Sequence, residues 1–134
     1  MIKFESRTGK IEYPEEKVYD FLSDFNNLEQ FIPEDQVTDW ESTEESCKFK
    51  VRELGEFGLK IIEKQPHNLI KITGEENSPL NFFFWIQLKQ LTENDTRIRI
   101  TIKAALNPVM KSVVAKPINN FLEKLIDEIE KLSF

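Results

Sequence analysis

The residues that could do chemistry are few and stand apart from one another. The chain has one histidine, His67, and one cysteine, Cys47. A histidine base needs a partner within hydrogen-bond reach, and the residues around His67, Gln65-Pro66-His67-Asn68, have the composition of a turn. One cysteine and one histidine cannot supply the ligands of the common zinc sites. We therefore predict no catalytic residue and no metal site, and interpret His67 as a surface turn residue.

Carboxylates are numerous, but their spacing does not favour acid–base chemistry. They occur as the adjacent pairs Glu15-Glu16, Glu44-Glu45 and Glu75-Glu76. Adjacent residues point to opposite faces of a strand and diverge by about 100° on a helix, so these pairs are typical of solvated surfaces. Motifs of the types GxGxxG, GxxxxGK[ST], HExxH and GxSxG do not occur in the sequence. We therefore expect no cofactor.

Composition and charge limit the class of protein. The 134 residues are 40% hydrophobic and include 11 phenylalanines, which predicts one packed domain over residues 1–134. The formal charge of −6 repels a phosphate backbone, so no nucleic-acid partner is expected. The longest apolar run, residues 82–86, is too short for a membrane span. The N-terminus lacks the layout of a signal peptide and Cys47 has no disulfide partner, so we expect a cytoplasmic protein.

Alternating apolar and polar residues predict a series of strands. Each strand has one apolar and one polar face, which is typical of an antiparallel sheet with one solvated side. A first strand begins at Ile2, and Pro14 is expected to open a helix that reaches Phe25. A second short helix follows and ends at Pro33. Six further strands are expected within 37–40, 47–51, 57–61, 70–72, 82–88 and 97–104, with turns at 53–55, 65–68, 75–79 and 92–95.

The last segment of the chain predicts a long amphipathic helix over residues 109–132. Asn107 and Pro108 are suited to its cap and first position. About 25 residues would span about 37 Å, enough to cross a curved sheet. Pro117 inside the helix either bends it to follow the sheet or holds its N-terminal half away and leaves a void. The expected apolar stripe contains Met110, Val113, Val114, Pro117, Phe121, Leu125, Ile129 and Leu132, widened by Ile118 and Leu122.

The order of these elements, and the stretch from Tyr13 to Phe25, carry a resemblance to a known family. A proline followed by Val18, Tyr19, Leu22 and Asp24 resembles the first helix of the SRPBCC superfamily, which includes START-related and Bet v-type proteins and polyketide cyclases. The resemblance implies an α+β helix-grip fold. In this fold a curved antiparallel sheet of about seven strands wraps around a long C-terminal helix, and two short helices follow the first strand. It also implies a cavity beneath that helix for an apolar or amphipathic molecule.

The inward side chains of the expected strands are nearly all apolar, which is typical both of a filled core and of a small-molecule pocket. Our leading hypothesis is non-enzymatic binding of a small hydrophobic or amphipathic ligand between the sheet and the C-terminal helix. A polyketide cyclase-like or dehydratase-like enzyme is the first alternative and would need Ser6, Thr8 or an unplaced acid to point inward. A protein-interaction domain is the second. The predicted ligand-binding residues are Phe49, Val51, Phe57, Leu59, Ile72, Phe82, Phe84, Ile100, Ile102, Met110, Val114, Pro117 and Phe121.

Phe83 and Trp85 are the anomaly in this pattern. If Phe82, Phe84 and Ile86 face inward, period two places Phe83 and Trp85 on the wet outer face. There they could pack under the stems of Lys103 and Arg99, or form an interface with another copy of the chain. A register that turns them inward is the third reading. We predict a homodimer through this outer sheet face.

Overall fold

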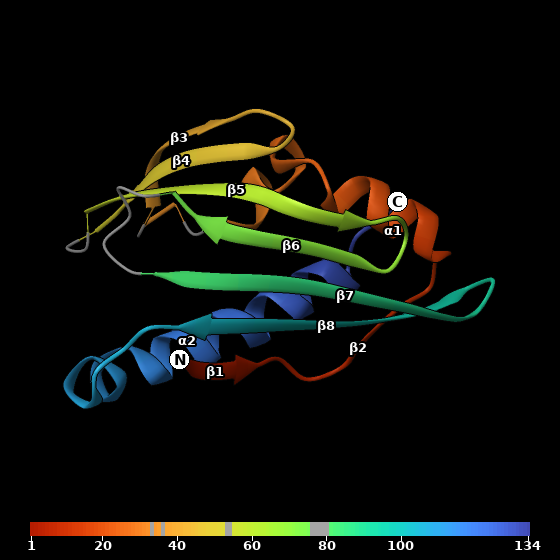
Figure 1. Ribbon diagram of the computed structural model, residues 1–134. Helices are drawn as coiled ribbons and strands as arrows, with labels where there is room; N and C mark the ends of the chain where they lie inside the picture. Colours follow the sequence, from red (N-terminus) through yellow and green to blue (C-terminus); the bar gives the residue numbers. More distant parts are fainter. Residues whose placement is uncertain (33, 36, 53–54, 76–80) are drawn as a thin grey trace.

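An antiparallel sheet dominates the computed structural model, which describes residues 1–32, 34–35, 37–52, 55–75 and 81–134 (Figure 1). In the described part of the chain the sheet has eight strands in the order β1-β8-β7-β6-β5-β4-β3, and β2 also pairs with β8. The strands are β1 (Ile2–Glu5), β2 (Gly9–Ile11), β3 (Val37–Ser42), β4 (Ser46–Val51), β5 (Gly55–Gln65), β6 (Leu69–Gly74), β7 (Phe82–Thr92) and β8 (Asp95–Ala104).

Two helices complete the fold. The first, α1 (Glu15–Leu22), follows β2, and the second, α2 (Pro108–Glu130), runs behind β8 and β1 in Figure 1. The side chain of Asn107 caps α2 by accepting a hydrogen bond from the Met110 amide at 2.8 Å, as predicted. The turn at 65–68 is also confirmed, because the Asn68 amide donates to the Gln65 carbonyl. The α+β helix-grip architecture is therefore confirmed.

Three details differ from the sequence-based expectation. The first expected strand is divided into β1 and β2, which brings the strands to eight. The first helix ends at Leu22 instead of Phe25, because the Asp24 carboxylate accepts from the Asn26 amide and the Phe25 amide donates to the Glu44 carbonyl. The second expected helix is a pair of 3-10 turns, η1 (Phe25–Asn27) and η2 (Glu29–Phe31). Its stop at Pro33 and most of the turns expected at 53–55 and 75–79 lie outside the described residues.

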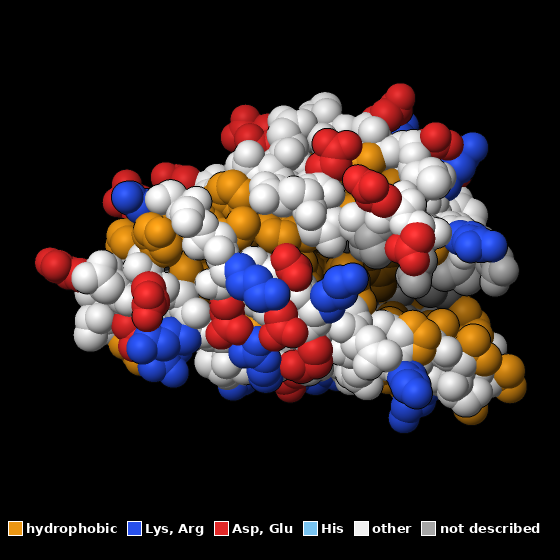
Figure 2. Space-filling view, turned by 180° about the vertical axis from the view of Figure 1, so that it is seen from behind, with side chains coloured by type: hydrophobic (Ala, Val, Ile, Leu, Met, Phe, Trp, Pro, Cys, Tyr) orange, Lys and Arg blue, Asp and Glu red, His pale blue; other side chains and the backbone are white. Residues whose placement is uncertain are grey.

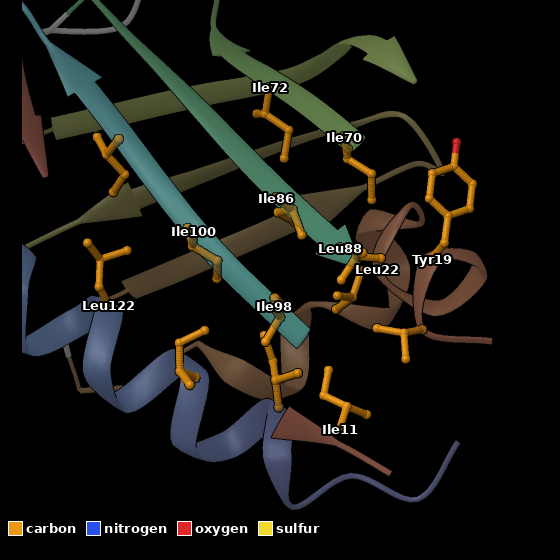
Figure 3. Close-up of a cluster of buried hydrophobic side chains, with 14 of the residues drawn as sticks. Ile11, Tyr19, Leu22, Ile70, Ile72, Ile86, Leu88, Ile98, Ile100 and Leu122 are labelled. Carbon is orange, nitrogen blue, oxygen red and sulfur yellow. The ribbon is translucent and has the colours of Figure 1, made fainter. Parts of the chain in front are cut away.

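The strand register assigns one face of the sheet to the core. Ile70, Ile86 and Ile100 are directly opposite one another on β6, β7 and β8, and all three are buried. Leu22 of α1 and Leu122 of α2 close over this face (Figure 3). The opposite outer face carries the alternate, mainly polar residues of the same strands.

Only the C-terminal half of α2 is buried against the sheet. Leu122, Ile126 and Ile129 are its buried residues, and all lie after Pro117. Gly9 permits the close approach, since a Cβ atom there would lie 2.8 Å from Cγ2 of Ile126. Before Pro117 the helix has only half-buried and exposed side chains. This distribution is what we expect if the N-terminal half of the helix is held away from the sheet.

The helix also presents a slightly different face from the predicted one. Leu122 and Ile126 form the centre of the buried stripe, whereas Phe121 is 37% exposed and Val113 is 68% exposed. Apolar residues stand side by side at 113–114, 117–118, 121–122 and 125–126, so the apolar surface is wider than one packed stripe. The sequence therefore predicted an apolar face correctly but centred it one residue too early.

An ion-pair cluster fixes the C-terminal half of α2 to the loop between β1 and β2. The Arg7 guanidinium contacts Glu123, Asp127 and Glu130. Its hydrogen bond to Glu130, assisted by the Lys10 backbone amide, lowers the pKa of the Glu130 carboxyl. A group whose folded-state pKa is lowered stabilises the fold above its ordinary pKa, and this contribution is lost as the pH falls through the folded-state value.

We therefore expect Arg7→Gln to lower the free energy of unfolding by about 1 kcal/mol at pH 7, since these groups are largely solvent-exposed. The difference between variant and wild type should be smaller near pH 3, because the stabilisation from Glu130 is lost as the pH falls through its lowered pKa. Urea unfolding at the two pH values measures it. Lys124→Gln removes the same charge from an exposed position on α2 and should have little effect at either pH. An Arg7→Gln deficit that is unchanged at pH 3 would contradict the electrostatic explanation.

Candidate functional site

A row of four aromatic side chains crosses the inner face of the sheet at the end where α2 begins. Trp40 of β3 stacks on Phe49 of β4 at 5.6 Å between ring centroids, and Phe49 stacks on Phe57 of β5 at 5.8 Å. Phe57 in turn lies 6.5 Å from Phe82 of β7. Phe82 is opposite Ala104, the last residue of β8, so this aromatic row reaches the start of α2. All four side chains are half-buried.

The aromatic row belongs to a larger apolar surface at the edge of the core. Phe57 and Phe82 stand outside the main core cluster and the side chains that pack against it, whereas Trp40 and Phe49 pack against that cluster. Figure 2, viewed from the α2 side, shows hydrophobic side chains at the surface where α2 begins and a hollow between this end of the helix and the strands. We call this surface the open apolar end. Its residues are the aromatic row with Val51, Leu59 and Phe84 of the sheet and Met110, Val114 and Ile118 of α2, all half-buried.

The predicted ligand-binding residues divide between two environments. Ile72, Ile100 and Ile102 are buried in the core cluster. Pro117 and Phe121 are exposed on α2. The remaining predicted residues lie in the open apolar end: Phe49, Val51, Phe57, Leu59, Phe82, Phe84, Met110 and Val114.

A depression of about 500 Å³ adjoins the aromatic row at the β3–β4–β5 edge of the sheet. Trp40, Phe49 and Phe57 line it together with charged residues that include Lys48 and Glu75. α2 contributes none of its lining, so this depression differs from the predicted cavity between sheet and helix, which stays a prediction.

Trp40 is the residue of this region that the sequence did not place. A register shift between Thr38 and Glu41 inserts an extra residue into β3, and Asp39 has a φ of 57°. This bulge turns Trp40 onto the inner face, against Phe49. Its indole Nε1 is buried and has no acceptor among the described residues. The sequence signal for this bulge was Asp39 directly before Trp40, since aspartate adopts a positive φ more readily than most residues.

The polar groups of the enzyme alternative are engaged elsewhere. Ser6 is buried as expected, but its hydroxyl donates to the Arg7 carbonyl and accepts from the Ile100 amide. Thr8, which the enzyme alternative could have used if it pointed inward, is exposed, and its hydroxyl accepts from Arg99. Between β1 and β2 the chain leaves its pairing with β8. The alternation of inward and outward side chains therefore does not continue to Thr8. Where the pKa of a described carboxyl is shifted, at Glu5, Asp95 and Glu130, a neighbouring cation lowers it.

His67 lies in its predicted turn with a φ of 71°, and its ring meets the edge of Tyr19 at 5.6 Å. This pair is near α1, at the other end of the sheet from the aromatic row. Burial raises the pKa of the Tyr19 hydroxyl. Within the described residues we find no group of three or more potential ligands placed to hold a metal ion. Likewise, no described helix combines the length and hydropathy of a transmembrane segment.

Phe83 and Trp85 lie on the outer face. Their partners on β8 are Lys103 and Thr101. The Lys71 ammonium lies 4.8 Å from the Phe83 ring centroid and 5.3 Å from that of Trp85, and Lys103 lies 5.6 Å from Trp85. Lysine ammonium groups therefore lie beside both rings, and Lys71 is a neighbour that the sequence did not predict. The homodimer through this face stays a prediction.

Solved structures share this fold at low sequence identity. The protein XoxI from Bacillus cereus superposes with a TM-score of 0.76 at 12% identity, covering 98% of this chain and 94% of that one. Norcoclaurine synthase from Thalictrum flavum, a point mutant in complex with a transition state analogue, gives 0.68 at 12% identity over 95% and 96%. The Aha1 dimer from Colwellia psychrerythraea gives 0.63 at 21% identity over 98% of each chain. These likenesses establish the fold alone, and together with the family match of the sequence they confirm the predicted SRPBCC resemblance.

The sequence itself matches a family, although no curated protein matches it individually. Residues 8–132 match the family model of CoxG, a subunit of carbon monoxide dehydrogenase. The match runs from the loop before β2 to the residues just after α2, and so includes the aromatic row and the whole C-terminal helix. The chain therefore belongs to the CoxG family of carbon monoxide dehydrogenase subunits.

Proposed function

We propose that this protein binds a small apolar or amphipathic molecule, without chemical conversion, between the inner face of its sheet and the N-terminal half of α2. The observation that carries the proposal is the half-buried aromatic row at the end of the sheet where α2 has no buried side chain. Aromatic and aliphatic walls with few polar groups are typical of small-molecule sites. Covering this surface with a ligand would remove apolar area from water at about 25 cal/mol per Å².

The fold and family are consistent with a binding role. The norcoclaurine synthase structure, a complex with a transition state analogue, shares this fold. The CoxG family is named for one subunit of a dehydrogenase, and a subunit that only binds a molecule needs no catalytic group of its own. We further propose that residues 1–134 act as one domain and that the protein is cytoplasmic.

The indole of Trp40 favours an amphipathic ligand over a purely apolar one. A buried N–H without an acceptor costs about 1–3 kcal/mol. A ligand with an oxygen near the aromatic row would supply the acceptor that the described residues do not provide. Small local movement would be needed, because the Nε1 atom is covered in the structure.

Substitution of Phe57 tests the proposal, with N-phenyl-1-naphthylamine as a neutral apolar fluorescent probe. Phe57→Ala removes the ring that joins Phe49 to Phe82, and we expect the dissociation constant of the probe to rise about tenfold, the equivalent of about 1.4 kcal/mol. Phe83→Ala is the matched control, since it truncates an equally half-buried phenylalanine on the outer face of the same sheet. It should leave probe affinity within about twofold.

Equal loss of affinity in the two variants, or no saturable probe binding by wild type, would refute the proposed site. If the probe binds as expected, native mass spectrometry of the full chain purified from its own host identifies the natural ligand by its retained mass.

A further inference from the structure

The outer face of the sheet gathers positive charge that the net charge of the chain hides. The strand register places Lys3 of β1, Lys71 of β6, Lys89 of β7, and Arg99 and Lys103 of β8 on this face, which is turned toward the viewer in Figure 1. Arg97 and Lys10, which are directly opposite each other, continue the row that contains Lys89. The chain as a whole has a formal charge of −6. The basic outer face is therefore a local feature within an acidic protein.

Several of these cations lack a counter-charge. Glu5 pairs with Lys3 at 2.9 Å and with Arg99 at 3.6 Å, and Asp95 pairs with Arg97 at 2.8 Å. Lys71 and Lys103 form no ion pair with the described residues. Glu63 is opposite Lys71 on β5 but accepts instead from the Gln65 side chain.

The arrangement is costly for the fold by itself. Lys103 is directly opposite Lys3 in the register, as Lys89 is opposite Arg97. Like charges directly across a strand pair are destabilising. Such rows do not improve sheet stability, and an anionic partner would relieve their repulsion.

A depression of about 270 Å³ shows where such a partner would bind. Lys3, Glu5, Arg99, Lys103 and the Trp85 ring are among its lining residues, and the Glu5 carboxylate pairs there with Lys3 and Arg99. Lys103 is the lining cation that forms no ion pair with the described residues. The Trp85 ring, bordered by the ammonium groups of Lys71 and Lys103, offers an apolar contact beside the charges.

We propose that the basic outer face docks an acidic segment of a partner protein. The carboxylates of the segment pair with Lys71 and Lys103, and an apolar side chain of the segment packs on Trp85. A second copy of this chain, the partner predicted from the sequence for this face, is the competing occupant, but pairing two such faces would oppose one set of cations to another. A nucleic acid would also supply negative charge, and the experiment distinguishes it from an acidic peptide.

Isothermal titration calorimetry with a synthetic peptide tests the proposal. The peptide has one central leucine flanked by five glutamates on each side, and the protein is the full chain at low salt. We expect the double variant Lys71→Glu, Lys103→Glu to weaken binding by about tenfold or more. The control Lys116→Glu, Lys124→Glu changes the net charge equally on α2 and should weaken binding less than about threefold. Amide shifts on β7 and β8 should map the wild-type contact.

Four results would overturn the proposal. They are absence of peptide binding by wild type, equal weakening in both double variants, tighter binding of oligothymidylate than of the peptide, and a wild-type dimer in sedimentation that Lys71→Glu, Lys103→Glu dissociates. Matching thermal unfolding curves for the two double variants would exclude misfolding as the cause of any difference.

Discussion

Leu122→Ala is expected to lower the free energy of unfolding by about 2–5 kcal/mol, the usual cost of a large-to-small change in a core. Leu122 is fully buried and belongs to the same core cluster as the isoleucines of β7 and β8 (Figure 3). Its removal leaves a cavity at the point where the helix is attached to the sheet. Because the N-terminal half of α2 has no buried side chain, it cannot compensate for this loss.

The matched control for this prediction is Val113→Ala on the same helix. Val113 is 68% exposed, so its truncation should change stability by less than about 0.5 kcal/mol. Guanidinium chloride unfolding followed by circular dichroism gives both values. Comparable losses in the two variants would mean that the N-terminal half of α2 is packed as firmly as the C-terminal half, which would contradict the burial pattern of the helix.

The second large effect concerns the thiol of Cys47. Burial raises its pKa to about 12. The thiolate is the reactive species, so at pH 8 only about 10⁻⁴ of the folded protein would carry it, against roughly a quarter for a free thiol. We therefore expect Cys47 to react with Ellman's reagent about a thousandfold more slowly in the native protein than in the unfolded chain.

Absorbance kinetics at pH 8 with and without guanidinium chloride measure this ratio. A variant with Cys47→Ala and Val113→Cys gives the rate of an exposed thiol on the folded protein. The two thiols should differ by about the same thousandfold factor, since only one is buried. Native Cys47 that reacts as fast as the exposed thiol would mean that β4 and β5 open readily or are packed differently.

The sequence predicted the sheet and the long helix because both depend on periodicity. The alternation of apolar and polar residues at 47–51, 82–88 and 97–104 correctly predicted which side chains face inward. Asn107 correctly predicted where α2 begins. The division of the first strand into β1 and β2 was missed, because it depends on backbone pairing with β8. The end of α1 was missed for a similar reason, since a contact with Glu44, distant in sequence, sets it.

The candidate site was predicted only in part. Apolar periodicity identifies inward residues but does not show which of them a neighbouring element covers. Ile72 and Phe57 therefore look alike in the sequence pattern. In the structure Ile72 is buried, whereas Phe57 lies half-buried at the end of the sheet where α2 has no buried side chain. The position of Trp40 depended on a bulge in β3, which alternation along the sequence does not predict.

The central claim is that a ligand enters between the open apolar end and the N-terminal half of α2. Intermolecular nuclear Overhauser effects between N-phenyl-1-naphthylamine and methyl-labelled protein test it most directly. We predict contacts to the methyl groups of Val51, Leu59 and Val114, and none to those of Ile11 and Val18 in the packed end of the core. Contacts confined to other methyl groups, or none from these three at saturation, would contradict the claim.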